Sequence, residues 1–206
     1  MHKEARDFII YVKSIFPQFF SDKVVLDVGS GDINGNNREF FTDCIYEGND
    51  VIQAKNVTIV SKTKDLPYAD GYFDTIVSTE CFEHDPEYTE SLKKIYKLLR
   101  PGGLFCFTCA STGRPEHGTR RTSPQNSYGS IGKLSDMIDY YKNLTEKDIN
   151  AVLNLKQSFS SWDTYYNFGR SDLYFVGIKN EATTEPSQLP TKFIYPKVEI
   201  TSRNIQ

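Results

Sequence analysis

The chain has 206 residues, 38% of them hydrophobic and 25% charged, and its net charge is −3 at pH 7. This length suits one domain with a sizeable core. The net negative charge argues against a general nucleic-acid binder, which usually carries a basic excess. Because no apolar run is long enough to span a bilayer and the first residues lack a signal-peptide core, we expect a cytoplasmic protein without a membrane span.

Strand and helix patterns alternate in the first half of the chain. Apolar residues at helical spacing predict a helix at residues 2–16, and Pro17 ends this pattern. The following segments predict five strands at 23–28, 44–50, 57–60, 72–78 and 104–109, with an amphipathic helix at 88–99 that ends in a turn at 100–103. The order strand, helix, strand, strand, strand, helix, strand predicts a doubly wound α/β fold with a parallel sheet.

The second half of the chain has a different character. Residues 111–132 form a polar loop in this prediction, and Thr145 with Asp148 marks a capped helix that runs to about Leu155. The next apolar segments predict a closing antiparallel hairpin, with strands at residues 158–166 and 172–179. We therefore expect a single domain over residues 1–180 and a C-terminal arm or disordered tail over residues 181–206.

A glycine-rich turn follows the first predicted strand. Asp27, Gly29, Ser30 and Gly31 lie in the sequence VLDVGSGD, and glycines at this place let a ligand approach the backbone. The turn lacks the third glycine of the dinucleotide fingerprint, and the acid Asp27 suits a ligand with an ammonium group. Asp50 ends the second strand 19 residues after Gly31, where a carboxylate typically binds ribose hydroxyls. A ligand that carries both an amino acid and a ribose is S-adenosylmethionine.

Four sequence blocks, in this order and at this spacing, resemble class I S-adenosylmethionine-dependent methyltransferases: VLDVGSGDINGNN, YEGNDV, DLPYADGYFDTIVS and LLRPGG. Together they cover roughly residues 22–110. The resemblance implies a Rossmann-like sheet of seven strands, mostly parallel, with a C-terminal antiparallel hairpin. It also implies that the positions of Asp27, Gly29 and Gly31 bind the methionine end of the cofactor and that Asp50 binds its ribose.

The same resemblance assigns the adenine end of the cofactor. It implies that Val51, after the second strand, and Asp65 and Leu66, before the fourth, flank the adenine. Many relatives carry an acid three or four positions before this leucine, where this chain has Lys62 and Thr63. Asp65 or a backbone group is then expected to bind the adenine amine instead.

The segment ECFEHDP follows the fourth predicted strand, at the same edge of the sheet as the glycine-rich turn. If it forms one helical turn, Glu80, Glu83 and His84 stand at positions i, i+3 and i+4 and share one face. With His117, from the loop after the fifth strand, they could hold Mg²⁺ or Mn²⁺. This pattern resembles the metal site of small-RNA 2′-O-methyltransferases. Because of its place at this edge, we also count Glu80 among the cofactor-binding residues.

A hydroxyl acceptor of a methyl group needs a base or a metal ion, because its own pKa lies far above 7. We therefore assign catalytic roles to His84, His117 and Glu83. Two alternatives stay open. His84 could act as a general base without a metal, or Glu83 could serve only as the acidic residue at the start of the next helix.

The sequence defines the acceptor less well. Arg114 in the polar loop and the aromatic residues Trp162, Tyr165 and Tyr166 are candidate acceptor contacts. The longer pattern, which adds CFEHDPEY and ASTGRPEHG, resembles methyltransferases that accompany glycosyltransferases in surface-glycan assembly. This implies O-methylation of a saccharide acceptor, such as a glycan deoxyhexose, with glycosyltransferases of the same pathway as partners.

Other function classes remain as alternatives to this prediction. Within methyltransferases, the acceptor could be a small phenol or a nucleic-acid ribose, the latter being disfavoured by the net negative charge. From other classes, the chain could be a nicotinamide-dependent oxidoreductase, against which Asp27 and the missing third glycine argue, or a module that binds S-adenosylmethionine without turnover.

Overall fold

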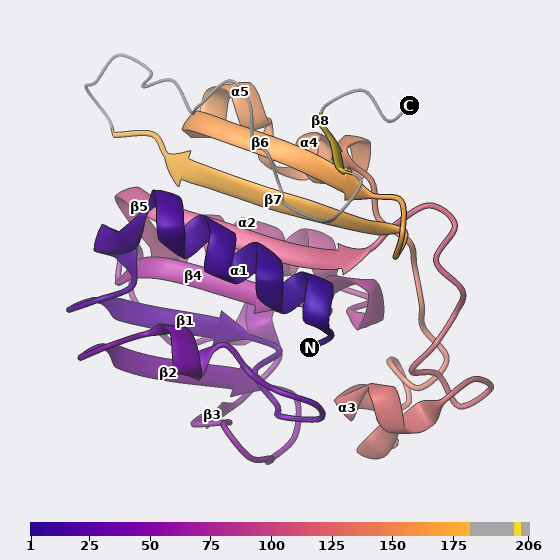
Figure 1. Ribbon diagram of the computed structural model, residues 1–206. Coiled ribbons are helices and arrows are strands. Elements are labelled where there is room, and N and C mark those ends of the chain that lie inside the picture. The colour runs from indigo at the N-terminus through magenta and orange to yellow at the C-terminus, as the bar shows by residue number, and fades with distance from the viewer. Residues whose placement is uncertain (182–199, 203–206) are drawn as a thin grey trace.

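The computed structural model describes residues 1–181 and 200–202. Its strands are β1 (Val24–Val28), β2 (Ile45–Asp50), β3 (Ile59–Val60), β4 (Phe73–Thr79), β5 (Leu99–Ala110), β6 (Phe159–Asn167), β7 (Asp172–Lys179) and β8 (Ile200–Ser202). They form one sheet in the order β3-β2-β1-β4-β5-β7-β6-β8 (Figure 1). Strands β1 to β5 are parallel, and β7 is antiparallel to both β5 and β6. The predicted seven-stranded, mostly parallel sheet with its C-terminal hairpin is thus confirmed.

Strand β8 lies in the part of the chain that we expected to be an arm or a tail. It pairs with β6 in antiparallel register, with Ile200 opposite Asn167. The rest of that segment, residues 182–199 and 203–206, lies outside the described residues.

Helices cover both faces of the sheet (Figure 1). They are α1 (Lys3–Ile15), α2 (Tyr88–Leu98), α3 (Tyr128–Ile131), α4 (Glu146–Leu153) and α5 (Leu155–Ser158). Phe8 of α1 packs in one apolar layer with Val25, whereas Leu92 of α2 packs in the other layer with Leu26. Adjacent residues of β1 pack in opposite layers because successive side chains of a strand point to opposite faces of the sheet. No helix of the described residues combines the length and apolar character that a membrane crossing requires.

The connection between β1 and β2 differs from the predicted helix. Residues 29–44 contain only a single 3₁₀ turn, η2 (Arg38–Phe40). Side chains bond to the backbone there: Asp32 accepts a hydrogen bond from the N–H of Gly35 at 2.7 Å, and Asn36 accepts one from the N–H of Arg38 at 3.0 Å. Such local bonds compete with helix formation, so the sequence GDINGNN stays irregular.

Most other predicted boundaries lie within a few residues of the observed ones, but the predicted polar loop contains α3, and the helix predicted to reach about Leu155 ends at Leu153, before α5. The capping box of α4 is present as predicted, since Asp148 accepts a hydrogen bond from the backbone N–H of Thr145 at 2.9 Å. Strand β5, however, begins at Leu99 instead of residue 104. Its pairing with β4 shifts register between Phe73 and Thr75, so the predicted turn at residues 100–103 is an irregularity within the strand.

Candidate functional site

A pocket opens where β1, β2 and β4 end, which is the edge of the sheet where open α/β folds bind ligands. It contains about 640 Å³ of empty space, a figure that includes its mouth open to solvent. The strand ends and the loops after β3 and β4 supply one wall, and the segment around α3 supplies the other (Figure 1). Its lining residues include Gly29, Asp50, Val51, Lys62, Thr63, Glu80, His84, Tyr128 and Met137.

The glycine-rich turn after β1 leaves no room for side chains. Gly29 has a φ of +72°, in the left-handed region that favours glycine. A methyl group on Gly31 would overlap the ring of Tyr128 and would stand 2.8 Å from a carboxylate oxygen of Asp50. Gly29 lines the pocket, whereas Gly31 lies beneath Tyr128 and beside Asp50 and is not among the lining residues.

Asp50 joins this turn to the end of β2. Its two carboxylate oxygens accept hydrogen bonds from the backbone N–H groups of Gly31, at 3.0 Å, and Val51, at 2.8 Å. Burial raises the pKa of Asp50 above its ordinary value. Asp50 and Val51 both line the pocket, as the resemblance implied. The carboxylate is thus fixed in orientation by backbone donors while remaining accessible to a ligand.

Asp27 and Ser30 are buried behind the turn instead of lining the pocket. Asp27 accepts hydrogen bonds from the hydroxyl of Tyr46 at 2.6 Å and from the side-chain amide of Asn37 at 2.9 Å. Burial raises the pKa of Asp27 to about 6. The hydroxyl of Ser30 donates to the carbonyl of Asn56 at 3.3 Å. Both residues therefore shape the turn from behind.

The predicted adenine contacts are placed differently from the expectation. The side chain of Asp65 is exposed and pairs with Lys64, while Leu66 is buried in the apolar core. Lys62 and Thr63 line the pocket in their place. Lys62 precedes the 3₁₀ turn η3 (Thr63–Asp65), in which Thr63 is buried and Asp65 is exposed. The residues of this segment that face the pocket lie two and three positions before Asp65.

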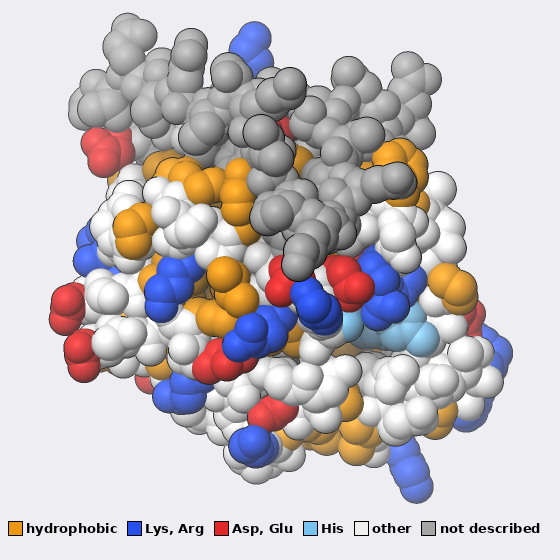
Figure 2. All heavy atoms as spheres, in the orientation of Figure 1, with side chains coloured by type: hydrophobic (Ala, Val, Ile, Leu, Met, Phe, Trp, Pro, Cys, Tyr) orange, Lys and Arg blue, Asp and Glu red, His pale blue; other side chains and the backbone are white. Residues whose placement is uncertain are grey.

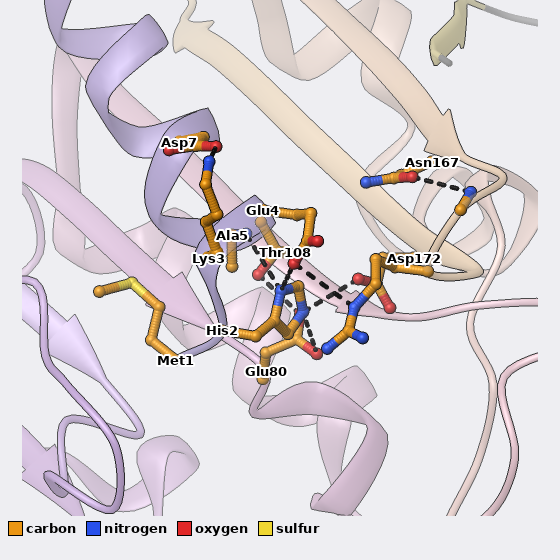
Figure 3. A network of polar contacts seen from close by, with 12 residues as sticks. Met1, His2, Lys3, Glu4, Ala5, Asp7, Glu80, Thr108, Asn167 and Asp172 are labelled. Carbon is orange, nitrogen blue, oxygen red and sulfur yellow. Dashed lines mark hydrogen bonds and ion pairs between the residues drawn. The ribbon is translucent and has the colours of Figure 1, made fainter. Parts of the chain in front are cut away.

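Glu80 does not share a face with Glu83 and His84. The 3₁₀ turn η4 (Phe82–His84) begins after it, and Glu80 itself has a φ of +55°, which is uncommon for a non-glycine residue. Figure 3 shows its carboxylate directed toward His2 and Asp172. Its oxygens lie 3.2 Å from Nε2 of His2 and 2.9 Å from the hydroxyl of Thr108, which donates to it. Glu80 therefore belongs to a second polar cluster.

This second cluster is an ion-pair network. His2 Nε2 lies 3.0 Å from Asp172, and the guanidinium of Arg114 lies 2.9 Å from the same carboxylate and 3.9 Å from that of Glu80. Burial alone would raise the pKa of Glu80, but the bond to His2 and the charges of His2 and Arg114 lower it to about 2. The carboxylates of Glu80 and Asp172 are thus ion-paired with His2 and Arg114, and Glu4 lies on the other side of the His2 imidazole, 3.0 Å from Nδ1.

Glu83, His84 and His117 do come together, as the metal hypothesis required. Each offers a ligand atom within 4.8 Å of the others, and the two imidazole rings meet edge to face with centroids 5.0 Å apart. Both carboxylate oxygens of Glu83 and Nδ1 of His84 are buried without a hydrogen-bond partner in the described part of the chain. Burial raises the pKa of Glu83 well above its usual range, and burial, followed by the charge of His117, lowers that of His84 to about 3.

Orphaned polar atoms are rare in protein interiors, and here three of them belong to the neighbouring side chains of Glu83 and His84, with His117 beside them. These donor groups suit a divalent cation such as Mn²⁺, which accepts oxygen and imidazole ligands. Figure 2 shows histidine side chains at the molecular surface beside cationic and acidic ones. Of the three candidate ligands, Glu83 and His84 are buried and His117 is half-buried. The residues present therefore fit a cation held by Glu83, His84 and His117.

The predicted acceptor contacts serve structural roles. Arg114 pairs with Asp172 and donates to the carbonyl of Arg170 at 2.8 Å. Tyr165 is buried in the apolar layer of α1, and Tyr166 donates its hydroxyl to the carbonyl of Thr112. Trp162 packs against the opposite apolar layer. None of the four lines the pocket described above.

The sequence prediction missed the wall around α3. Tyr128 and Met137 line the pocket from a segment that we expected to be a polar loop or left unassigned. Lys62 joins this segment to the opposite wall through ion pairs at 2.6 Å to Asp136 and to Glu87. Isolated apolar residues in a polar stretch carry no periodicity, so no local signal marked these positions.

Comparisons with known proteins agree with this geometry. A family model described as a methyltransferase domain matches residues 26–107. A 2-methyl-6-phytyl-1,4-hydroquinone methyltransferase of Oryza sativa subsp. japonica is 29% identical over 158 residues, which are 73% of this chain and 41% of that protein. A tocopherol O-methyltransferase of Arabidopsis thaliana is 31% identical over 99 residues, 39% of this chain and 28% of that one. The chain thus spans less than half the length of these two relatives.

A solved structure extends the comparison to the whole sheet. The 1,6-didemethyltoxoflavin-N1-methyltransferase of Burkholderia thailandensis, with bound S-adenosylhomocysteine, superposes with a TM-score of 0.57 at 16% identity, over 86% of this chain and 80% of that one. At this identity the likeness concerns the fold. The chain therefore carries a match to the methyltransferase domain in its central segment, on the Rossmann-like fold of S-adenosylmethionine-dependent methyltransferases.

Proposed function

We propose that this protein is an S-adenosylmethionine-dependent O-methyltransferase. The observation that carries the proposal is one pocket that joins the open glycine turn and the Asp50 carboxylate to His84. Asp50 would accept hydrogen bonds from the ribose hydroxyls, and the backbone at Gly29 and Gly31 would border the methionine end. His84, at the other end of the same pocket, would lie near the methyl group and the acceptor.

A divalent cation, Mg²⁺ or Mn²⁺, forms the second part of the proposal. Glu83, His84 and His117 would hold it, and it would lower the pKa of an acceptor hydroxyl by withdrawing electron density. Glu80 would instead orient the pocket wall through His2 and Thr108. The alternative, in which His84 is a metal-free base, leaves both carboxylate oxygens of Glu83 buried without a role, and we therefore prefer the cation.

The acceptor is proposed to be a hydroxyl group, with a saccharide as the expected class. The saccharide rests on the sequence resemblance to enzymes of surface-glycan assembly, with glycosyltransferases of that pathway as expected partners. Two similar proteins are named as a hydroquinone methyltransferase and a tocopherol O-methyltransferase. A phenolic acceptor is therefore the second candidate.

Two measurements test the proposal in sequence. Calorimetry with S-adenosylhomocysteine and with NAD should give binding only of the former, and NAD binding would exclude the methyltransferase assignment. Release of S-adenosylhomocysteine is then followed with a deoxyhexose glycoside, a catechol and a primary amine as acceptors. Turnover of the amine alone would contradict O-methylation, and turnover of the catechol alone would replace the saccharide by a phenol.

The cation is tested on the same reaction. Treatment with EDTA should abolish release of S-adenosylhomocysteine, and Mn²⁺ or Mg²⁺ should restore it. Activity that is indifferent to EDTA would leave the methyltransferase proposal standing and assign His84 the role of a metal-free base.

A further inference from the structure

Tyr141 packs against both histidines of the candidate cation site, although no sequence motif marks it. Its ring centroid lies 5.0 Å from that of His117 and 5.7 Å from that of His84. Its hydroxyl is shielded from solvent and has no hydrogen-bond partner among the residues that the structure describes. Its oxygen is therefore a fourth orphaned polar atom, beside the two carboxylate oxygens of Glu83 and Nδ1 of His84.

The backbone around Tyr141 is held by the same elements that carry the cluster. The N–H of Lys142 donates to the carbonyl of Glu83 at 2.9 Å, and the N–H of Leu144 donates to that of Ala110 at 2.9 Å. The side-chain amide of Asn143 donates to the carbonyl of Arg114 at 3.0 Å. The backbone beside Tyr141 is thus held next to Glu83 by the fold. The hydroxyl of Tyr141 and the carboxylate of Glu83 are not hydrogen-bonded to each other in this structure, so a bond between them requires these side chains to shift.

A buried hydroxyl without a partner costs about 1–3 kcal/mol, so its retention calls for a reason. Burial, followed by the charge of Glu83, raises the pKa of Tyr141, so the phenol remains a hydrogen-bond donor at neutral pH. Carboxylates that bind a metal ion are themselves hydrogen-bonded, which fixes their orientation. Glu83 has no such donor among its described neighbours, and Tyr141 has no acceptor.

We propose that Tyr141 is a positioning residue of this site, whose hydroxyl donates to the carboxylate of Glu83 and orients it toward the cation. The inference rests on the cation site proposed above and is independent of the identity of the acceptor. It assigns Tyr141 a role through Glu83, without contact to the cofactor or the reacting atoms.

The test uses Mn²⁺ alone as the probe, with neither cofactor nor acceptor present. Calorimetric titration of Tyr141→Phe should give Mn²⁺ affinity about 10- to 100-fold below wild type, the usual effect of removing a support of a metal ligand. Tyr140→Phe is the matched control, because it removes the same atom from the next residue, and it should bind like wild type. Glu83→Gln should abolish binding.

Thermal unfolding separates this role from packing. Tyr141→Phe removes an unpartnered hydroxyl, so without Mn²⁺ it should unfold at the wild-type temperature or higher, while the rise in Tm on adding Mn²⁺ should shrink. Wild-type Mn²⁺ affinity in Tyr141→Phe would overturn the role of Tyr141 and leave the cation site intact. A wild-type protein that binds no Mn²⁺ would overturn both, whereas the methyl-transfer assay would still decide the proposed reaction separately.

Discussion

Nε2 of His2 lies 3.2 Å from Oε2 of Glu80, so the cap of α1 is tied to the residue that follows β4. The same nitrogen lies 3.0 Å from Asp172 at the start of β7 (Figure 3). Glu80 lines the candidate pocket, and its left-handed backbone needs support from its surroundings. The N-terminal helix thus helps to shape the pocket wall from a distance of nearly eighty residues along the chain.

This contact predicts a pH dependence of stability. Burial opposes protonation of His2, but Asp172 and Glu80 outweigh it and raise its pKa to about 9, from an ordinary value of 6.5. Glu4, at 3.0 Å from Nδ1, is the third acid that faces the imidazole, and Arg114 is the nearby cation. The stabilisation is therefore fully present below about pH 6.5 and is lost as pH rises through about 9, on the order of 3 kcal/mol.

His2→Gln should flatten this dependence. Urea unfolding measured from pH 6 to pH 10 should show a free energy of unfolding that falls by on the order of 3 kcal/mol more in wild type than in the variant. Lys3→Gln, next to it and mostly exposed, is the control and should keep the wild-type slope. Equal slopes for wild type and His2→Gln would show that folding leaves the pKa of His2 unchanged.

Asp50 and Asp65 form a matched pair for testing the cofactor site. Asp50→Asn removes the charge that would bind the ribose, and we expect about 10- to 100-fold weaker binding of S-adenosylhomocysteine, since a bond to a charged group contributes about 1.5–3 kcal/mol. Asp65→Asn makes the same chemical change on an exposed residue outside the pocket and should bind like wild type. Calorimetry that gave the larger loss for Asp65 would restore the original sequence prediction.

The fold could be predicted from the sequence because its signals are local and periodic. Apolar runs, the turn at Gly29 and the capping box of Thr145 each specify backbone geometry within a few residues. The helix expected between β1 and β2 failed because side chains such as Asp32 and Asn36 bond to the local backbone, a competition that apolar spacing does not reveal.

The site could be predicted only where its residues stand directly beside elements that such local signals specify. Asp50 ends β2, Val51 follows it directly, and both line the pocket. The grouping of Glu83 and His84 with His117 was anticipated, but the separation of Glu80 depends on its left-handed backbone and on His2, 78 positions away. Tyr128 reaches the pocket from the far wall, and only the tertiary fold determines such a contact.

Gly31 tests the packing between the two walls. Because a methyl group there would overlap Tyr128 and crowd Asp50, Gly31→Ala should lower the free energy of unfolding by about 1–3 kcal/mol and weaken binding of S-adenosylhomocysteine. The double variant with Tyr128→Ala should regain part of the lost stability, which urea unfolding would measure. Gly169→Ala is the control, since its added methyl group would meet only Asn167, at 3.4 Å. A fully stable Gly31→Ala would mean that Tyr128 moves away freely.

Asp27 predicts a stability dependence of the same sign as that of His2, but in a more acidic pH range. Its pKa is raised by burial from 3.8 to about 6, so between these values the unfolded chain loses its proton first. Stability due to this group therefore falls as pH rises from about 4 to 6, by about 3 kcal/mol for a shift of this size, and stays low above it.

Asp27→Asn carries no charge in either state, and so it should escape this loss. The free energy of unfolding of the variant minus that of wild type should increase by about 3 kcal/mol between pH 4 and pH 7. A constant offset from the altered bonds to Tyr46 and Asn37 is expected at every pH and leaves that increase unchanged. Asp43 is an exposed loop residue, so for Asp43→Asn the same difference in free energy of unfolding should not increase with pH. A difference that is independent of pH would mean that the pKa of Asp27 in the folded protein is close to its ordinary value. The hydrogen bonds from Tyr46 and Asn37 would then offset the effect of burial on that pKa.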